Sequence, residues 1–387
     1  MTNESDVPRA DTVGSLLRDD AVVRAARRSS PADSALLEDA VRDAIRLQEE
    51  AGLDVITDGE VRRTSWAQTP RFVDAFAPTA GRRALNWRGA TEGVFGAPQT
   101  EPGPGHSGGQ SGSQTSSTSA GYPGVVRRVA TARRTGDMTA EYEFLVRYAR
   151  TRTKFTMPAP SYHRRYWPSG YTAAAGYDSC EEFLGEIRDY LRSVVDRLIE
   201  LGCDYIQLDA PNYGSLCDPD TRDAMTAEGR DPDAELAFDA ALDNSLFDGV
   251  TGVTTALHVC RGNGPAGAWH SAGGYGAISA ALFPKLAMDR LLLEYDSDRA
   301  GGFEPLADVR EGTVVVLGLL TTKSPRIEAD AELLERISEA ARHKPLAELA
   351  LSTQCGFASV PIANPVTPAV QRAKLETVVR VARRVWE

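Results

Sequence analysis

The sequence predicts an α/β protein built as one closed (β/α)8 barrel, the TIM-barrel architecture, with a long insertion after the second strand. Short apolar segments alternate with amphipathic stretches along the chain, a pattern typical of a parallel sheet covered by helices. Eight such segments occur, which favours a closed barrel over an open sheet. The length of 387 residues suits one large barrel, and no Gly-x-Gly-x-x-Gly motif follows the first segment, which argues against a dinucleotide-binding fold.

The predicted elements follow one another in regular order. Each predicted helix places apolar residues three and four positions apart, and the first two end at a glycine, Gly52 and Gly202. The predicted helices span 34–52, 181–202, 330–343 and 368–386. The predicted strands span 11–15, 54–60, 153–158, 204–209, 254–260, 290–295, 313–319 and 349–355.

One segment interrupts this alternation. Residues 64–150 lie between the second and third predicted strands and are too many for a barrel loop. Within them, residues 98–124 are rich in Gly, Ser, Pro, Gln and Thr, a composition that cannot bury enough apolar surface to become ordered. We therefore expect one catalytic domain, 1–387, with an insertion at its active-site end that contains a flexible loop; a spacer without a role is the alternative.

Composition and charge limit the classes of partner. The net charge of −11 argues against nucleic acid and against anionic membrane surfaces. No run of about 18 apolar residues occurs, so no transmembrane helix is expected, and the first residues lack the apolar core of a signal peptide. We expect a cytoplasmic protein that acts on small molecules, and the sequence leaves its oligomeric state open.

The five cysteines are an odd and scattered set, which fits a reducing compartment better than a disulfide framework. Two of them, Cys260 and Cys355, end predicted strands and are candidate metal ligands. The other three lie on predicted helices or loops, where packing or surface roles are expected: Cys180, Cys203 and Cys217.

His258 and Cys260 form the strongest local signal for chemistry. They lie two residues apart at the end of a predicted strand, so both side chains point to the same side. A His nitrogen and a Cys sulfur are both common zinc ligands. On its own this pair is weak evidence, because a buried His and Cys more often have only a structural role.

Two further strand ends strengthen the case for zinc. Glu294 lies near the end of one predicted strand, and Cys355 ends another and is followed by Gly356. Active sites of (β/α)8 barrels lie at the carboxyl ends of the strands, so these residues should converge with His258 and Cys260. Two thiolates, an imidazole and a carboxylate form a tetrahedral zinc set. Such a closed set is usually structural, yet this end of the barrel is catalytic and needs no metal for stability.

Polar residues also end three other predicted strands. Ser15, Glu60 and Asp209 end the first, second and fourth strands and are candidates for substrate binding. The alternatives are helix capping by Ser15 and Asp209, and a surface ion pair of Glu60 with Arg62 or Arg63.

Taken together, these motifs resemble the C-terminal catalytic barrel of cobalamin-independent methionine synthases. The resemblance spans nearly the whole chain outside the insertion. It is carried by Val13-Gly14-Ser15, Asp58-Gly59-Glu60, Ile206-Gln207-Leu208-Asp209-Ala210-Pro211, His258-Val259-Cys260, Glu294 and Gln354-Cys355-Gly356.

The resemblance implies an activity and a role for each motif. It implies that a catalytic zinc is held by His258, Cys260, Glu294 and Cys355. It also implies that Ser15, Glu60 and Asp209 hold the amino-acid part of homocysteine, which accepts a methyl group from methyltetrahydrofolate or a methylcorrinoid to give methionine. The chemistry agrees, because a thiol has a pKa of about 8.5 and zinc coordination removes its proton. Carboxylates suit the substrate ammonium group, and Ser15 suits its carboxylate.

Several departures leave the substrates open. The second, N-terminal barrel of the longer synthases is absent from this sequence, and the usual His-Gly-Glu is Asp58-Gly59-Glu60. The usual Asp-Glu-Pro is Asp209-Ala210-Pro211, which lacks one carboxylate. Alkyl transfer, or C–S bond formation or cleavage, on another specialised thiol is therefore an alternative, and a non-catalytic zinc- or thiol-binding protein is a second.

A methyltransferase of this kind also needs a proton donor, because folate N5 is a poor leaving group until it is protonated. Three residues are candidates for such a proton relay, among which the sequence does not choose: His163, Asp209 and His270.

Overall fold

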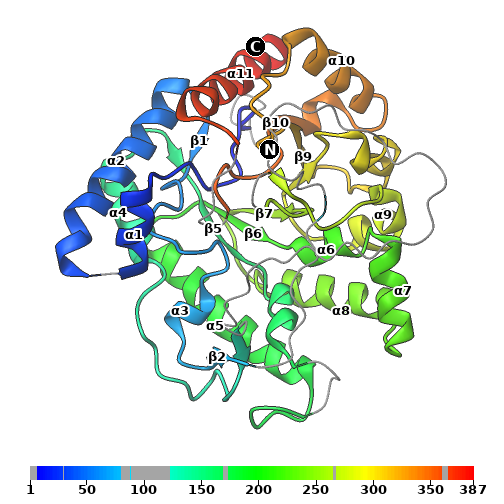
Figure 1. The fold of residues 1–387 in the computed structure, drawn as a ribbon. Coiled ribbons are helices and arrows are strands. Elements are labelled where there is room, and N and C mark those ends of the chain that lie inside the picture. Colours follow the sequence, from blue (N-terminus) through cyan, green and yellow to red (C-terminus); the bar gives the residue numbers. More distant parts are fainter. Residues whose placement is uncertain are drawn as a thin grey trace, which may run out of the picture.

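A computed structural model describes residues 7–28, 30–79, 88, 123–168, 173–264, 267–359 and 365–387. Its centre is a six-stranded parallel sheet in the order β10-β9-β8-β7-β6-β5, so that strands adjacent in the sheet are successive along the chain (Figure 1). These strands correspond to six of the predicted ones, with ends that differ by at most two residues. They are β5 (Phe155–Pro158), β6 (Tyr205–Asp209), β7 (Thr254–Val259), β8 (Arg290–Glu294), β9 (Val314–Leu320) and β10 (Leu349–Thr353).

These strands are buried on both faces, which explains why their sequences are nearly continuous apolar runs. One face packs against the helices in a large apolar core. The other face contributes to a second, smaller buried cluster made of single residues from successive strands. Its members are Val13, Val55, Tyr205, Ala256, Leu292, Val316 and Ala350.

The first two predicted strands are much shorter than expected. Only β1 (Val55–Ile56) forms from 54–60, and it pairs in parallel with β4 (Arg152–Thr153). The segment 11–15 forms no strand, and its neighbour Ala10 makes a single bridge to Leu351. The physical reason is that side chains, instead of the backbone of a neighbouring strand, donate hydrogen bonds to carbonyl oxygens of this segment. Gln207 donates to the carbonyl oxygen of Val13, and Thr57 donates to that of Gly14.

Backbone hydrogen bonds continue from β10 through these short pieces. The N–H of Leu351 donates to the carbonyl oxygen of Arg9 at 2.8 Å, and the N–H of Asp54 donates to that of Ala10 at 3.0 Å. The N–H of Lys154 donates to the carbonyl oxygen of Ile56 at 2.9 Å. The closed eight-stranded barrel stays a prediction, which these contacts support.

Helices surround the strands (Figure 1). The four predicted helices form as α2 (Ser34–Ala51), α5 (Cys180–Glu200), α10 (Asp330–Ala340) and α11 (Pro368–Trp386). As predicted, α2 ends at Gly52, which has the left-handed φ of 84° that glycine tolerates. Further helices are α1 (Asp20–Arg28), α6 (Pro211–Ser215), α7 (Pro219–Ala227), α8 (Pro232–Ser245) and α9 (Ser279–Leu282). In the described parts of the chain, no helix has the length and apolar character needed to cross a membrane.

The described part of 64–150 carries its own elements. They are α3 (Thr69–Phe72), β2 (Phe76–Pro78), β3 (Pro123–Val125) and α4 (Ala140–Tyr148). The strands β2 and β3 pair antiparallel, with Phe76 opposite Val125. Of the predicted flexible loop 98–124, residues 98–122 lie outside the described residues. Pro123 and Gly124 belong to β3 instead, because they pair with Pro78 and Ala77.

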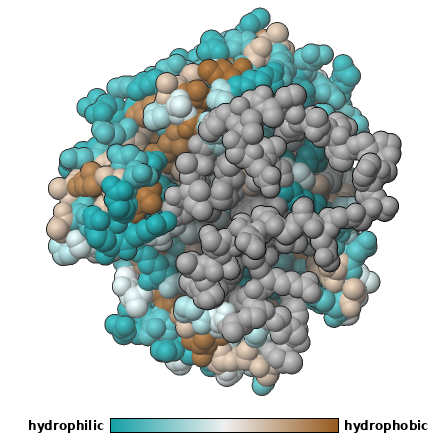
Figure 2. All heavy atoms as spheres, viewed as in Figure 1, coloured by the Kyte–Doolittle hydropathy of each residue, from teal (hydrophilic) through white to brown (hydrophobic). Residues whose placement is uncertain are grey.

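The surface in the view of Figure 2 is mainly hydrophilic where its residues are described, and apolar side chains lie there in small separate groups. The large apolar side chains that are exposed are scattered over several helices and loops. They are Leu36, Val126, Val146, Tyr148, Ile199, Ile327 and Leu346. Single exposed apolar residues of this kind are common on protein surfaces and need no special explanation.

Candidate metal centre

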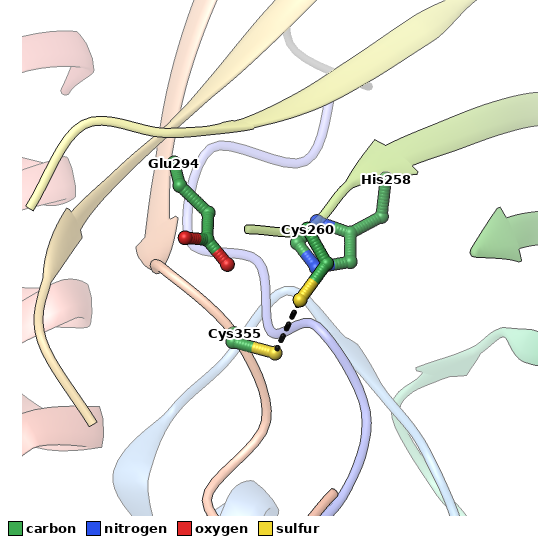
Figure 3. A group of neighbouring side chains, drawn as sticks. All are labelled: His258, Cys260, Glu294 and Cys355. Carbon is green, nitrogen blue, oxygen red and sulfur yellow. Dashed lines mark hydrogen bonds between the residues drawn. The ribbon is translucent and has the colours of Figure 1, made fainter. Parts of the chain in front are cut away.

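Four potential metal ligands meet at the carboxyl ends of β7, β8 and β10. One ligand atom from each of His258, Cys260, Glu294 and Cys355 lies within 4.8 Å of those of the others. Figure 3 shows the four side chains pointing toward one another. His258 lies on β7 and Glu294 ends β8, whereas Cys260 and Cys355 lie just beyond their strands instead of ending them as predicted. The structure thus brings together residues that are up to 97 positions apart in sequence.

The chain leaves the strands early for local reasons. The register between β9 and β10 shifts at Ser352 and Thr353, and this irregularity ends the ladder before Cys355. Gly318 on β9 allows the close approach, because a Cβ there would lie 2.7 Å from the Cα of Gln354 and 2.9 Å from the carbonyl oxygen of Leu293. Glu294 and Cys355 are therefore carried toward the same point from either side of β9.

The cluster contains buried polar atoms that lack partners. His258 is 2% exposed and Glu294 is 0% exposed. Among the described residues, neither carboxylate oxygen of Glu294 nor Nε2 of His258 has a hydrogen-bond partner. The other ring nitrogen of His258, Nδ1, lies 3.3 Å from the carbonyl oxygen of Leu292, an arrangement that leaves Nε2 available to bind a metal. Buried polar groups without partners are costly, so this donor set fits a bound cation such as zinc.

The pKa shifts of the four side chains also favour a bound cation. The two sulfur atoms of Cys260 and Cys355 lie 3.7 Å apart. Their hydrogen bond raises the pKa of Cys260 well above its usual value and lowers the pKa of Cys355 well below it, so the pair shares one proton. Burial lowers the pKa of His258, but the Cys355 sulfur outweighs this effect and raises the pKa to about 9. Burial raises the pKa of Glu294. A divalent cation would replace these protons.

Lys323 is a neighbour of the cluster that the sequence reasoning missed. Its Nζ atom is buried and lies 3.9 Å from Oε2 of Glu294. It follows β9 by three residues, so the same rule of strand ends that identified the ligands would have found it.

Glu60 lies in a turn beyond β1 and not at a strand end. Its φ is 54°, in the left-handed region that a residue other than glycine seldom adopts. Oδ1 of Asp58 accepts the N–H of Glu60 at 2.9 Å and so supports the turn. Oε1 of Glu60 accepts the Thr156 hydroxyl at 2.8 Å and lies 3.3 Å from Nη1 of Arg63. Gly14 makes room for this carboxylate, since a Cβ there would lie 2.5 Å from Oε1.

The alternative interpretation of Glu60 was a surface ion pair with Arg62 or Arg63. The pairing with Arg63 is confirmed, but its location is not, because the Arg63 side chain is only 1% exposed. Glu141 of α4 completes the group with a contact of 2.8 Å to Nε of Arg63. No local sequence pattern indicates this partner, which comes from the insertion.

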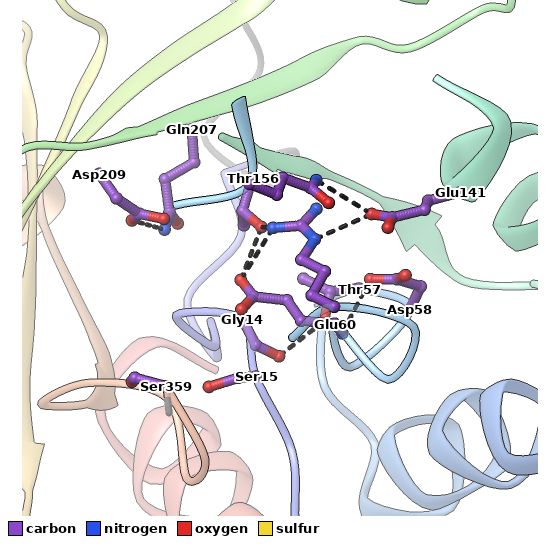
Figure 4. Close-up of polar contacts among 12 residues, drawn as sticks. Gly14, Ser15, Thr57, Asp58, Glu60, Glu141, Thr156, Gln207, Asp209 and Ser359 are labelled. Atoms are coloured by element: carbon purple, nitrogen blue, oxygen red, sulfur yellow. Dashed lines mark hydrogen bonds and ion pairs between the residues drawn. The ribbon is translucent and has the colours of Figure 1, made fainter. Parts of the chain in front are cut away.

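Asp209 is fixed by a buried network inside the sheet (Figure 4 shows its Gln207 partner). Nε2 of Gln207 donates to Oδ1 of Asp209 at 2.8 Å and to the carbonyl oxygen of Val13 at 2.9 Å. Lys154 donates to Oε1 of Gln207 at 2.7 Å and to Asp11 at 2.7 Å. These contacts fix which end of the Gln207 amide faces Asp209. Burial raises the pKa of Asp209 to about 7.

The capping alternatives for Ser15 and Asp209 are wrong. The N-cap residue of α6 is Ala210, and no side chain caps that helix. Ser15 precedes α1 by five residues, and its hydroxyl accepts the N–H of Ala358 at 3.3 Å instead. Figure 4 shows Ser15, Glu60 and Asp209 on three separate segments.

The two candidate histidines have different surroundings in the structure. His163 is 0% exposed and has Nδ1 at 2.9 Å from the carbonyl oxygen of Ala159 and Nε2 at 2.8 Å from the Thr69 hydroxyl. Burial lowers its pKa to about 4. Its ring is thus occupied in joining the loop after β5 to α3, and it makes no hydrogen bond to the four ligands among the described residues.

His270 lies beside Gly262, in the segment that follows the proposed ligand Cys260. A Cβ on Gly262, two residues after Cys260, would lie 2.4 Å from the His270 ring. Burial, together with the positive charges of Arg165 and Lys323, lowers its pKa to about 4. Its Nδ1 contacts the Ser271 hydroxyl. The role of either histidine in proton transfer stays a prediction.

Two proteins of Bacillus subtilis (strain 168) are similar to the whole chain. The uncharacterized protein YxjH is 33% identical over 399 residues, which cover 98% of this chain and 94% of YxjH. The uncharacterized protein YxjG is 30% identical over 392 residues, which cover 98% of this chain and 95% of YxjG. The chain belongs to the family of YxjH and YxjG. No family model matches its sequence.

Solved structures show which fold this family has. A proposed vitamin-B12 independent methionine synthase from Listeria monocytogenes is similar with a TM-score of 0.66 and 23% identity, over 98% of both chains. A B12-independent methionine synthase from Shewanella sp. W3-18-1, solved in complex with selenomethionine, is similar with a TM-score of 0.63 and 19% identity, also over 98% of both chains. The YxjH-family chain therefore has the fold of these proteins, in agreement with the resemblance of its motifs.

Proposed function

We propose that this YxjH-family protein is a zinc-dependent methyltransferase that moves a methyl group from methyltetrahydrofolate or a methylcorrinoid to a thiol such as homocysteine, giving methionine. The observation that carries the proposal is the buried set of His258, Cys260, Glu294 and Cys355, whose unpartnered atoms fit zinc. Zinc bound there would lower the pKa of an acceptor thiol and keep it as the nucleophilic thiolate.

The residues beside this set suit an amino-acid acceptor. Asp209 lies opposite His258 in the register of β6 and β7, so the proposed acceptor pocket adjoins the proposed metal site. We propose that Asp209 and Glu60 bind the ammonium group and that the Ser15 hydroxyl binds the carboxylate. The selenomethionine in the Shewanella protein supports an amino-acid ligand of this class.

The proton donor for the departing methyl carrier is proposed from geometry. His163 has both ring nitrogens occupied by Ala159, Pro160 and Thr69, so it is the weakest of the three candidates. Asp209 and His270 both lie next to the ligand segments and remain candidates. We further infer that the hydrogen bonds linking β10, 9–11 and β1 close the sheet into the (β/α)8 barrel of a single catalytic domain, 1–387.

Two observations favour a different thiol as the acceptor. Glu60 is already paired with the buried guanidinium of Arg63, which offsets part of the negative charge that would attract a substrate ammonium group. Position 210, where the related synthases carry a second carboxylate, is Ala210. Alkyl transfer, or C–S bond formation or cleavage, on a thiol without an α-amino group is therefore the second candidate function.

The test is direct. Zinc-loaded protein is incubated with homocysteine and either methyltetrahydrofolate or methylcobalamin, and methionine is measured by mass spectrometry, with the Cys260→Ala variant as the control. Methionine from the wild-type chain alone supports the first proposal. If the wild-type protein binds zinc but methylates only other thiols, the second candidate holds. A chain that binds no zinc would contradict both.

A further inference from the structure

Tyr275 stands between the two strands that carry three of the four proposed ligands. It lies in the segment after β7 and is 0% exposed. Its hydroxyl oxygen accepts the backbone N–H of Glu294 at 2.9 Å. The same hydroxyl donates to the carbonyl oxygen of Val259 at 3.4 Å. One side chain thus joins the end of β7 to the end of β8 through backbone atoms.

These contacts lie where the ladder between the strands stops. The last paired residues of β7 and β8 are Val259 and Leu293, and the ligands Cys260 and Glu294 come one residue later on each strand. The N–H of Glu294 is buried and needs an acceptor, because an unpaired buried backbone group is costly. The Tyr275 hydroxyl supplies that acceptor and takes the place of a further rung. It therefore links the backbones of the two strands at the point where their ladder ends.

The ring that carries this hydroxyl is itself held in place. The guanidinium of Arg261, the residue after Cys260, lies 4.2 Å from the centroid of the Tyr275 ring. Arg261 also donates to the carbonyl oxygen of Gly273, two residues before Tyr275. The ring of Tyr295 packs against the ring of Tyr275, with centroids 5.2 Å apart. The ring consequently has little freedom to move the hydroxyl.

We propose that Tyr275 is a positioning residue for the metal centre, which sets the separation between Glu294 and the pair His258 and Cys260 so that all can bind one zinc ion. This inference rests on the proposed zinc site. Partners that hold metal ligands in place by hydrogen bonds typically change metal affinity about 10- to 100-fold when they are removed. Tyr275 acts on the backbone of the ligand strands, so its loss should disturb the ligand geometry without removing any ligand.

The chain offers a matched control in Tyr295. This tyrosine belongs to the same buried aromatic group, but its hydroxyl has no hydrogen-bond partner among the described residues. Tyr275→Phe and Tyr295→Phe therefore remove the same atom from the same surroundings, and only the first removes the bridge. Zinc affinity is measured by competition with a chromophoric chelator. The geometry is followed independently by the visible absorption of the Co²⁺-substituted protein, and folding by thermal unfolding of the metal-free chains.

The outcomes separate the possibilities. We expect Tyr275→Phe to bind zinc about 10- to 100-fold more weakly than the wild type and to have a changed Co²⁺ spectrum. Tyr295→Phe should resemble the wild type in both measurements. Equal zinc affinity and an unchanged spectrum for Tyr275→Phe would overturn the inference, as would equal losses in both variants, which would indicate packing alone. If Tyr275→Phe does not fold, Arg261→Met keeps the hydroxyl but frees the ring, and it should show a smaller loss in the same direction. A wild-type chain that binds no zinc contradicts the proposed function, whereas tight wild-type binding with an unaffected variant contradicts only the role of Tyr275.

Discussion

The two groups of side chains at the carboxyl ends of the strands differ in how their polar atoms are satisfied. In the metal group, which consists of His258, Cys260, Glu294 and Cys355, buried oxygen and nitrogen atoms lack hydrogen-bond partners among the described residues. In the acceptor group, which consists of Ser15, Glu60 and Asp209, each side chain is held by neighbours. The unpartnered atoms of the first group fit a bound ion, whereas the side chains of the second group already have hydrogen-bond partners within the protein. This comparison predicts that substitutions in the metal group have larger effects than substitutions in the acceptor group.

The largest expected effect is the loss of metal. Cys260→Ala or Cys355→Ala should lose most of the bound zinc, about one ion per chain in the wild type, and all methyl transfer, because a closed zinc site needs its four ligands. Zinc is measured by elemental analysis of the purified proteins. Cys203→Ala, which removes a buried thiol outside the cluster, is the control and should keep its zinc. Full zinc content in both ligand variants would remove the distinction between the two groups.

The next effect concerns the support of the acceptor group. Lys154 and Asp11 form an ion pair in which both side chains are 0% exposed. Lys154→Met should lower the free energy of unfolding by about 3–5 kcal/mol, because it leaves the Asp11 carboxylate in the interior with less compensation. Denaturant unfolding of the metal-free protein measures it. The exposed pair of Arg46 and Asp43 is the control, and Arg46→Ala should have a far smaller effect.

A smaller effect is expected for the acceptor carboxylates themselves. Asp209→Asn and Glu60→Gln should weaken acceptor binding by about 1.5–3 kcal/mol, or roughly ten- to a hundredfold, since each removes a charge-assisted hydrogen bond to the substrate ammonium group. Zinc content should not change. Titration calorimetry with homocysteine measures the affinity. Asp239→Asn alters a buried carboxylate that pairs with Arg164 outside the pocket, and it should bind the acceptor normally.

If neither acceptor variant loses affinity for homocysteine, the second group does not bind an α-amino acid. The pairing of Glu60 with Arg63 would then be structural, and a different specialised thiol would be the better substrate candidate.

The smallest effect is expected in the insertion. Replacing residues 98–122 by a short Gly-Ser linker should leave zinc content and thermal unfolding nearly unchanged, because a change in the length of a connecting segment costs little stability. The KM for the methyl donor is the informative measurement. A raised KM in the linker variant would indicate that the segment contributes to binding of the methyl donor. Unaltered kinetics toward every donor would identify the segment as a spacer. Loss of zinc in this linker variant would contradict the expectation that the metal group and the acceptor group form without residues 98–122.

The sequence by itself predicted the strands beside which the proposed metal ligands lie, and it selected the four residues that the structure brings together. β7, β8 and β10 are almost entirely buried, so their apolar runs are visible locally, and residues at the ends of parallel strands must share one end of the sheet. Tertiary structure decided the rest. Residues 11–15 form no strand because two side chains that are distant in the sequence donate hydrogen bonds to the carbonyl oxygens of this segment. These side chains belong to Gln207 and Thr57.

The same reason explains the unforeseen partners of the site. The burial of Arg63 against Glu141 and the position of Tyr275 between β7 and β8 each depend on contacts between residues that are well separated in sequence. A local pattern of apolar and polar residues records which side of a strand or helix a residue faces. It does not record which distant side chain lies opposite, and that is settled only when the whole chain packs.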